Sequence, residues 1–170
     1  MNEDSNADET IKTSENSRKI VVGVDGSEAS HHALVWAAKE AQAHNEELDI
    51  VHVWNLPAVI WPSLWGGMTV MAPITPPKRE EVETYHKEVL DQIVKETNMI
   101  TDSSVILHPM LEEGNAAEVL LRIAKDADLL VVGSRGHGGF SGLRLGSVSS
   151  HCIHHAVCPI VVVPAEEVLD

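Results

Sequence analysis

A glycine-rich segment at residues 133–146 has the composition of an anion-binding loop. It reads GSRGHGGFSGLRLG and contains six of the eleven glycines in the chain. Glycine lets backbone N–H groups turn inward and approach an anion closely, because no side chain stands in the way. The segment leads into an expected helix at Ser147, whose first N–H groups and dipole favour negative charge. With the hydroxyls of Ser147 and Ser149 as further donors, the segment predicts a phosphate cradle; a ligand-free surface loop is the alternative.

Two widespread phosphate-binding fingerprints do not fit this segment. A P-loop ends in Gly-Lys-Ser or Gly-Lys-Thr, but Gly146 is followed directly by Ser147. A dinucleotide fingerprint that starts at Gly136 needs glycine or alanine at position 141, which is Ser141. It would also follow the fourth predicted strand, whereas the fingerprint follows the first. The loop is therefore neither a P-loop nor a dinucleotide-binding turn.

The elements that must position this loop alternate between short apolar runs and stretches of helical periodicity. Strands are predicted at 20–24, at 49–54, from 104–107 onward, at 128–133 and at 159–163. Helices are predicted from Ser27, over 78–97, from an Asn115 cap, and over 147–156. This alternation predicts an α/β protein with one doubly wound, parallel, five-stranded sheet and helices on both faces. An antiparallel α+β fold is the alternative, disfavoured because the strands lack inside–outside alternation.

Asp25 ends the first predicted strand and is the carboxylate best placed to meet the loop. Ligands of open parallel sheets bind at the carboxyl ends of the strands, where the strand order reverses. If the first and fourth strands are neighbours there, Asp25 faces Gly133 and can accept hydrogen bonds from ribose hydroxyls. Asp-Gly is also a common turn, and the residues alone favour neither reading. A covalent aspartyl phosphate is disfavoured, because residues 23–27 offer no second carboxylate for magnesium.

Composition narrows the class of protein. A chain of 170 residues fits about one domain, and its net charge of -14 repels nucleic acid and anionic membranes, so neither is an expected partner. There is no apolar run of about 18 residues and no secretory leader, so a cytoplasmic protein is expected. The two cysteines, Cys152 and Cys158, exclude a disulfide scaffold and are expected to be small buried hydrophobic residues.

Segments outside the regular pattern set the domain limits. Residues 1–18 are polar and acidic and predict a disordered tail, residues 19–164 form the domain, and residues 165–170 form a short C-terminal tail. Residues 55–77 are a long connection with five prolines and two of the four tryptophans. This connection is too apolar to lie free in water, so it is expected to cover the sheet edge, the pocket or a protein partner.

Three blocks of sequence resemble the universal stress protein family. Gly133-x2-Gly136-x9-Gly146-Ser147 resembles its ATP-binding signature, and IVVGVDGSEAS resembles its first strand and turn. DLLVVGSRGHGG and GSVSSHCIHHAVCPIVVVP resemble its fourth strand and its C-terminal end, so the similarity covers residues 18–164. The resemblance implies the strand order 3-2-1-4-5 and a cytosolic ATP-binding regulator or sensor of stress rather than an enzyme. A slow ATPase or phosphotransfer enzyme, a cyclic AMP-binding protein and a nucleotide-free interaction module are the alternatives.

The resemblance also implies the residues that contact the nucleotide. Position by position, the adenine and ribose contacts are Gly23, Val24, Asp25 and Val53; the ribose and phosphate path is Val132, Gly133 and Gly136; the phosphate contacts are Gly146, Ser147, Val148 and Ser149. Arg135, His137 and Arg144 are auxiliary charges. ATP is the expected ligand, with or without Mg²⁺, and no catalytic residue or resident metal is expected.

The C-terminal part of the chain carries two further features. His151, His154 and His155 have a spacing that could present imidazoles to a metal, but an exposed polar helix face is the favoured reading. Prolines bracket the last strand at 159 and 164, as edge strands permit. An apolar edge invites pairing with a second copy, and family members commonly dimerise through this region, so a homodimer is expected.

Overall fold

The computed structural model describes residues 18–56, 77–102, 105–136 and 145–165. Its strands are β1 (Lys19–Val24), β2 (Glu47–Trp54), β3 (Leu107–Glu113), β4 (Leu129–Gly133) and β5 (Ile160–Val163). Its helices are α1 (Glu28–His44), α2 (Arg79–Ile100), α3 (Ala116–Ile123), the short 3₁₀ helix η1 (Ala124–Asp126) and α4 (Ser147–His155). The predicted N-terminal tail up to residue 17, residues 57–76 of the apolar connection, and residues 166–170 lie outside the described residues.

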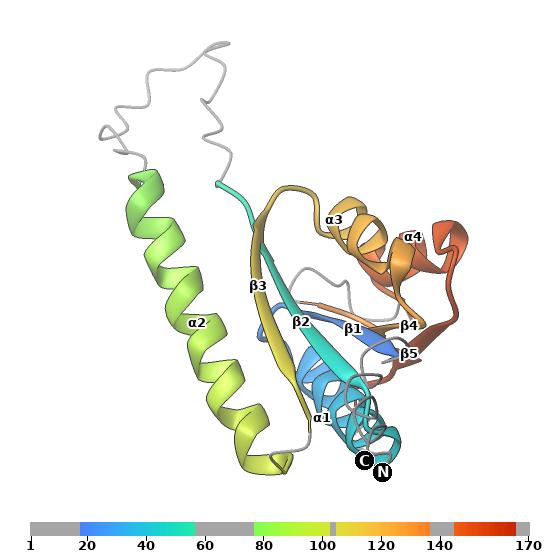
Figure 1. Ribbon diagram of the computed structural model, residues 1–170. Coiled ribbons are helices and arrows are strands. Elements are labelled where there is room, and N and C mark those ends of the chain that lie inside the picture. Colours follow the sequence, from blue (N-terminus) through green and yellow to red (C-terminus); the bar gives the residue numbers. More distant parts are fainter. Residues whose placement is uncertain (1–17, 57–76, 103–104, 137–144, 166–170) are drawn as a thin grey trace, which may run out of the picture.

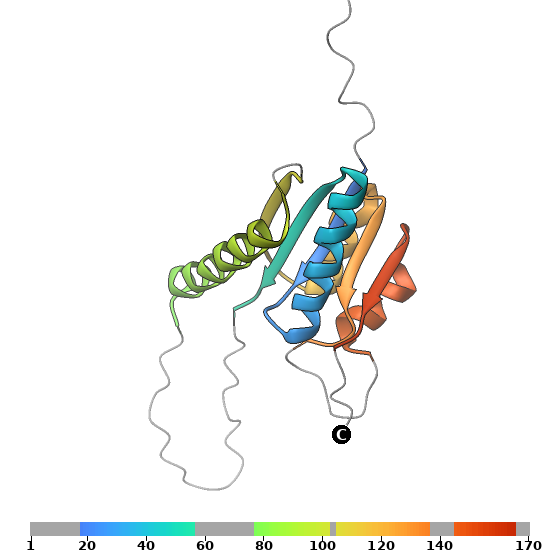
Figure 2. The same ribbon diagram turned by 90° about the horizontal axis from the view of Figure 1, so that it is seen from below.

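The five strands form one parallel sheet in the order β3-β2-β1-β4-β5, which confirms the predicted fold and strand order. Helices α1 and α2 lie on one face and α3 and α4 on the other (Figure 1). Figure 2 shows the same layers from below, with α1 crossing in front of the sheet. The order reverses at β1, between β2 and β4, so this is the position where a ligand is expected.

The central strands are buried on both faces, which explains their uninterrupted apolar sequence. On β1, Ile20, Val22 and Val24 pack with α1 and α2, whereas Val21 packs with α3 and α4. All four are at most 5% exposed. A parallel sheet covered on both faces needs apolar side chains in both directions. Packing on both faces fixes the position of β1 and β4, whose ends carry the site.

Helices α1 and α3 begin at side-chain caps, of which the Asn115 cap was predicted from the sequence. The Ser27 hydroxyl accepts a hydrogen bond from the Ser30 N–H at the start of α1. The Asn115 side chain accepts from the N–H groups of Ala117 and Glu118 and begins α3. Each cap satisfies N–H groups that the helix itself leaves without partners, and so fixes where the chain leaves the sheet edge that carries the site.

The third strand differs from its prediction. The strand was predicted to begin with the run 104–107, but it begins only at the last residue of that run, Leu107, and continues to Glu113. β3 is an edge strand that pairs only with β2, and it contains no fully buried residue. Its sequence therefore lacks the apolar run that identifies a central strand, and it tolerates Pro109 opposite Ile50.

Among the described helices, none combines the length and the apolar composition that a membrane span requires.

Candidate nucleotide-binding site

A cavity of about 380 Å³ opens at the carboxyl ends of β2, β1 and β4. All eleven residues that the sequence predicts as nucleotide contacts line it: Gly23, Val24 and Asp25 from the end of β1, Val53 from β2, Val132, Gly133 and Gly136 from β4 and its loop, and Gly146, Ser147, Val148 and Ser149 at the start of α4. The structure thus brings the set together, whereas its contact with a nucleotide stays a prediction. Of the auxiliary charges, Arg135 lines the cavity, and His137 and Arg144 lie outside the described residues.

The end of the cavity beside β4 has the properties of an anion site. Gly146 is the N-cap of α4, and no described side chain caps this helix. The first-turn N–H groups of α4 have no intrahelical partners and carry the positive end of the helix dipole. The Gly146 N–H donates to the Ser134 carbonyl at 2.7 Å, which fixes the start of α4 against the end of β4. Arg135 is the only Lys or Arg among the described lining residues, so it adds the one full positive charge.

Ser149 differs from its expected role as a side-chain donor to phosphate. The residue is 2% exposed, and its hydroxyl donates to the Ser134 carbonyl at 2.8 Å and approaches the Gly146 carbonyl at 3.1 Å. A hydroxyl has a single proton, which these carbonyls already accept. Ser149 therefore ties α4 to the loop, and only its backbone N–H is left for an anion. Ser147 is exposed at the mouth of the cavity.

Asp25 lies opposite this anion site, as the pairing of β1 with β4 requires. Its Oδ1 accepts hydrogen bonds from the N–H of Ser27 at 2.9 Å and from the Ser27 hydroxyl at 2.5 Å. Its Oδ2 lies toward the loop, so close to Gly136 that a Cβ atom added there would overlap it. One carboxylate oxygen therefore makes the turn and the other lies toward the loop, whereas the hydrogen bonds from ribose hydroxyls stay a prediction.

Gly133 is required by the fold itself. A Cβ atom at this position would lie 2.7 Å from the Ala29 carbonyl carbon and 2.8 Å from the Ser30 nitrogen, both backbone atoms of α1. Because backbone cannot move aside as a flexible side chain can, only glycine allows β4 to end this close to α1. The first two glycines of the signature thus have different tasks: Gly133 allows packing, and Gly136 leaves room beside Asp25.

Two histidines form the wall at the β2 end of the cavity. His52 is 3% exposed, and its Nδ1 lies 2.9 Å from the Val24 carbonyl. Its Nε2 lies 2.8 Å from Nδ1 of His86, which α2 contributes. The His86 ring stacks on Trp54, with centroids 5.9 Å apart and planes inclined by 25°. Burial, together with His52, lowers the pKa of His86 below its usual value.

This wall could not be predicted from the sequence. Six lining residues of the cavity were not predicted: Ser30, Val51, His52, His86, Ala116 and Leu120. Helical periodicity gives the extent of α2 but not its position over β2, so nothing along the chain connects His86 with the site. The available signal was His52 itself, a polar residue inside the apolar run DIVHVW.

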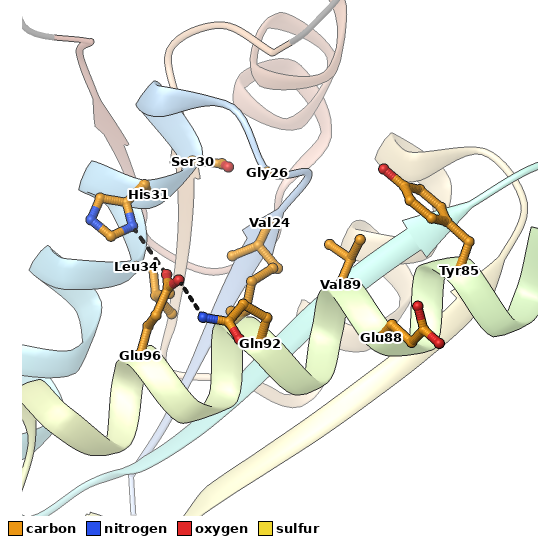
Figure 3. A pocket seen from close by; sticks show the side chains of 11 residues that line it. Val24, Gly26, Ser30, His31, Leu34, Tyr85, Glu88, Val89, Gln92 and Glu96 are labelled. Atoms are coloured by element: carbon orange, nitrogen blue, oxygen red, sulfur yellow. Dashed lines mark hydrogen bonds and ion pairs between the residues drawn. The ribbon is translucent and has the colours of Figure 1, made fainter.

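A second cavity, of about 400 Å³, lies between α1 and α2 and shares Val24 and Ser30 with the first (Figure 3). Figure 3 shows Glu96 between His31 and Gln92, and Glu88 further along α2 toward Tyr85. Its described lining contains two glutamates and no Lys or Arg. Such a lining repels phosphate, so this second cavity is the less suitable of the two for an anion.

The three histidines of α4 and the two cysteines do not form a metal or redox site with other described residues. His151, His154 and His155 are exposed, which confirms a polar helix face, and no group of three metal-ligating side chains occurs among the described residues. Cys152 is buried, and its burial raises the pKa of the thiol to about 11. Cys158 is half-buried, and its pKa is also raised by burial. Thiols are reactive as thiolates, so neither cysteine has the character of a redox centre.

A parallel sheet whose switch point brings together Gly136, the first turn of α4 and the Asp25 carboxylate defines an α/β protein with a cavity at the carboxyl ends of its strands. Residues 16–164 match the universal stress protein family, and the chain belongs to that family. Universal stress protein Rv1996 of Mycobacterium tuberculosis is 34% identical over 154 residues, which cover 86% of this chain and 48% of that protein. The chain spans about half the length of the curated relatives it matches.

Solved structures share the fold. Universal stress protein UspA from Lactobacillus plantarum superposes with a TM-score of 0.66 at 23% identity, covering 87% of this chain and 99% of that one. A universal stress protein solved in complex with cAMP gives a TM-score of 0.61 at 22% identity, covering 88% of this chain and 98% of that one. At these identities the likeness concerns the fold alone.

Proposed function

We propose that this protein binds ATP in the cavity at the switch point of the sheet and acts in the cytosol as a nucleotide-dependent regulator of the stress response. The observation that carries the proposal is the convergence of the Gly136 loop, the first turn of α4 and Arg135 at one end of the cavity. Backbone N–H groups, a helix dipole and a guanidinium are the groups that bind phosphates in proteins.

The lining gives the nucleotide a direction. Phosphates lie at the β4 and α4 end, where the donors and the positive charge are. Asp25, in the middle, accepts hydrogen bonds from ribose hydroxyls through the carboxylate oxygen that faces the loop. The opposite end is walled by apolar Val51, Val53 and Leu120, which suit the faces of a base. Charge therefore decreases from the phosphate end to the base end, as it does along a nucleotide.

Cyclic AMP is the second candidate, favoured by the structural neighbour solved in complex with it. It shares the base and ribose with ATP but carries less charge on its single phosphate. The cradle combines Arg135 with several N–H groups of α4, which is more than one cyclic phosphate engages. This excess of donors favours ATP.

Binding, rather than hydrolysis, is the proposed activity. Among the described lining residues Asp25 is the one carboxylate, and its Oδ1 already accepts two hydrogen bonds from Ser27. A lone carboxylate suits a Mg²⁺ ion that arrives on the phosphates, since Mg²⁺ in such sites takes one or two carboxylates plus phosphate oxygens. Phosphate release that scales with added protein and is absent from the Gly136→Val variant would instead establish an ATPase.

Two measurements test the proposal. Purified protein is denatured and the released small molecules are identified; an adenine nucleotide in the supernatant is expected. The emptied protein is then titrated with ATP and with cyclic AMP by calorimetry, with Ser150→Ala as a control on α4 outside the cavity lining. The expected result is ATP binding of equal strength in wild type and control. A protein that releases no nucleotide and gives no heat with either ligand at several temperatures would refute the proposal.

We also propose a homodimer through β5. This strand lies at the sheet edge, and its sequence IVVV has Ile160 and Val162 packed toward one face and Val161 and Val163 toward the other. An apolar edge strand is a template for pairing with another chain. Sedimentation is expected to give a dimer, and a monomer at high micromolar concentration would contradict it. A partner for residues 55–77 stays a prediction, because residues 57–76 lie outside the described residues.

A further inference from the structure

When both rings are neutral, the His52–His86 contact fixes which nitrogen of each ring carries a proton. The Val24 carbonyl is an acceptor only, so His52 must donate from Nδ1. A neutral His52 then has its lone pair on Nε2, and the 2.8 Å contact requires His86 to donate from Nδ1. The remaining nitrogen of His86, Nε2, is therefore an acceptor. A backbone carbonyl of β1 thus determines, through two rings, the hydrogen-bonding character of a residue on α2.

The surroundings of His86 hold its ring in place. The ring stacks on Trp54, which is 4% exposed. The Arg79 guanidinium lies 5.6 Å from the centroid of the same indole and forms an ion pair with Glu113 at the end of β3. The first turn of α2 is therefore anchored to the ends of two strands. A ring that is already oriented loses little entropy when it binds a ligand.

His86 lies at the end of the cavity where a base is expected. The anion-binding groups lie beside β4 and α4, and Asp25 of β1 separates them from β2. His52 and His86 line the cavity on the β2 side of Asp25. A nucleotide with its phosphates on α4 therefore extends its base toward the two histidines.

We propose that His86 determines the base specificity of the cavity, with Nε2 accepting a hydrogen bond from the exocyclic amino group of adenine, and that His52 is the positioning residue that keeps this nitrogen an acceptor. The inference rests on the proposed nucleotide binding and adds the residue that selects the base. A 6-oxo purine presents a carbonyl at that position, and two acceptors facing each other leave both without a donor. The lowered pKa of His86 supports the proposal, because it keeps the ring neutral near pH 7.

Affinities for ATP and ITP, which differ in the 6-amino and 6-oxo groups, test the proposal. They are measured by calorimetry at pH 7.5 in wild type, His86→Phe and Tyr85→Phe; Tyr85 touches the His86 ring but does not line this cavity. Wild type should prefer ATP by roughly tenfold or more, the difference that one hydrogen bond and one unsatisfied acceptor produce. His86→Phe should reduce this preference to about one, chiefly by weakening ATP, and Tyr85→Phe should keep it.

The outcomes separate this inference from the proposed function. If wild type binds ATP but does not distinguish it from ITP, or if His86→Phe keeps the preference, the base-specificity proposal fails and nucleotide binding stands. If wild type binds neither nucleotide, both proposals fail. A readout that needs no variant is ¹⁵N NMR of the histidine side chains at pH 7.5. It should show both His52 and His86 protonated at Nδ1, and an Nε2-protonated His86 would overturn the proposal.

Discussion

Replacing Gly136 with valine should weaken ATP binding at least roughly tenfold and leave the fold unchanged. Gly136 is exposed, but a Cβ atom there would overlap Oδ2 of Asp25. The valine therefore displaces the carboxylate or moves the loop away from it, and both changes disturb the cradle. Loss of one or two charge-assisted hydrogen bonds, each worth about 1.5–3 kcal/mol, raises the Kd for ATP by roughly tenfold to 20,000-fold. Calorimetry with ATP measures this change.

Gly133→Ala provides the matched contrast. Its Cβ would press on the backbone of Ala29 and Ser30, so the fold, rather than the ligand, suffers directly. Overpacking of this kind costs about 1–3 kcal/mol, which lowers Tm by roughly 2–12 °C in a chain of this size. Gly136→Val should keep its Tm within about 2 °C, since its site is exposed. Equal ATP affinity in wild type and Gly136→Val, or an equal loss of Tm in both variants, would refute the assignment of the two glycines.

The lowered pKa of His86, the raised pKa of Cys152 and the Asn115 cap of α3 lead to three further predictions. The pKa of His86 is lowered in the folded state, so the unfolded chain binds more protons than the folded chain at acidic pH. The free energy of unfolding, measured by urea denaturation, should therefore fall as the pH drops below about 6.5. This fall should be less steep in His86→Phe. The pKa of Cys152 is raised to about 11, so native protein at pH 8 should leave this thiol unmodified by iodoacetamide; labelling as fast as in urea would contradict its burial. Asn115→Ala removes the cap of α3 and should lower the free energy of unfolding by about 1 kcal/mol, whereas an unchanged urea midpoint would show the cap to be dispensable.

The central strands and the anion end of the site were predictable because their signals are local. β1 and β4 are buried on both faces, so their apolar runs stand out, and the caps Ser27 and Asn115 mark where helices begin. The glycine loop and the start of α4 are contiguous in sequence, and chain order alone places them after β4. Only the strand order was needed to bring Asp25 to them, and the resemblance provided it.

The β2 end of the cavity was not predictable because it depends on packing between distant elements. His52 and His86 are 34 residues apart, and their contact exists only because α2 lies over the end of β2. Ser149 shows a related limit. A serine at this position suggests a donor to phosphate, but its hydroxyl donates to the Ser134 carbonyl. This hydrogen bond forms because α4 packs against the end of β4, which the sequence does not reveal.

The most direct test is a titration of ¹⁵N-labelled protein with ATP, followed through the backbone amides. We expect the largest shifts at Gly136 and at Ser147, Val148 and Ser149, which line the proposed phosphate end of the cavity. Amides of Gln92 and Glu96, which line the acidic second cavity, should not move. Millimolar ATP that leaves the loop and α4 unchanged, or that shifts only the second cavity, would contradict this expectation.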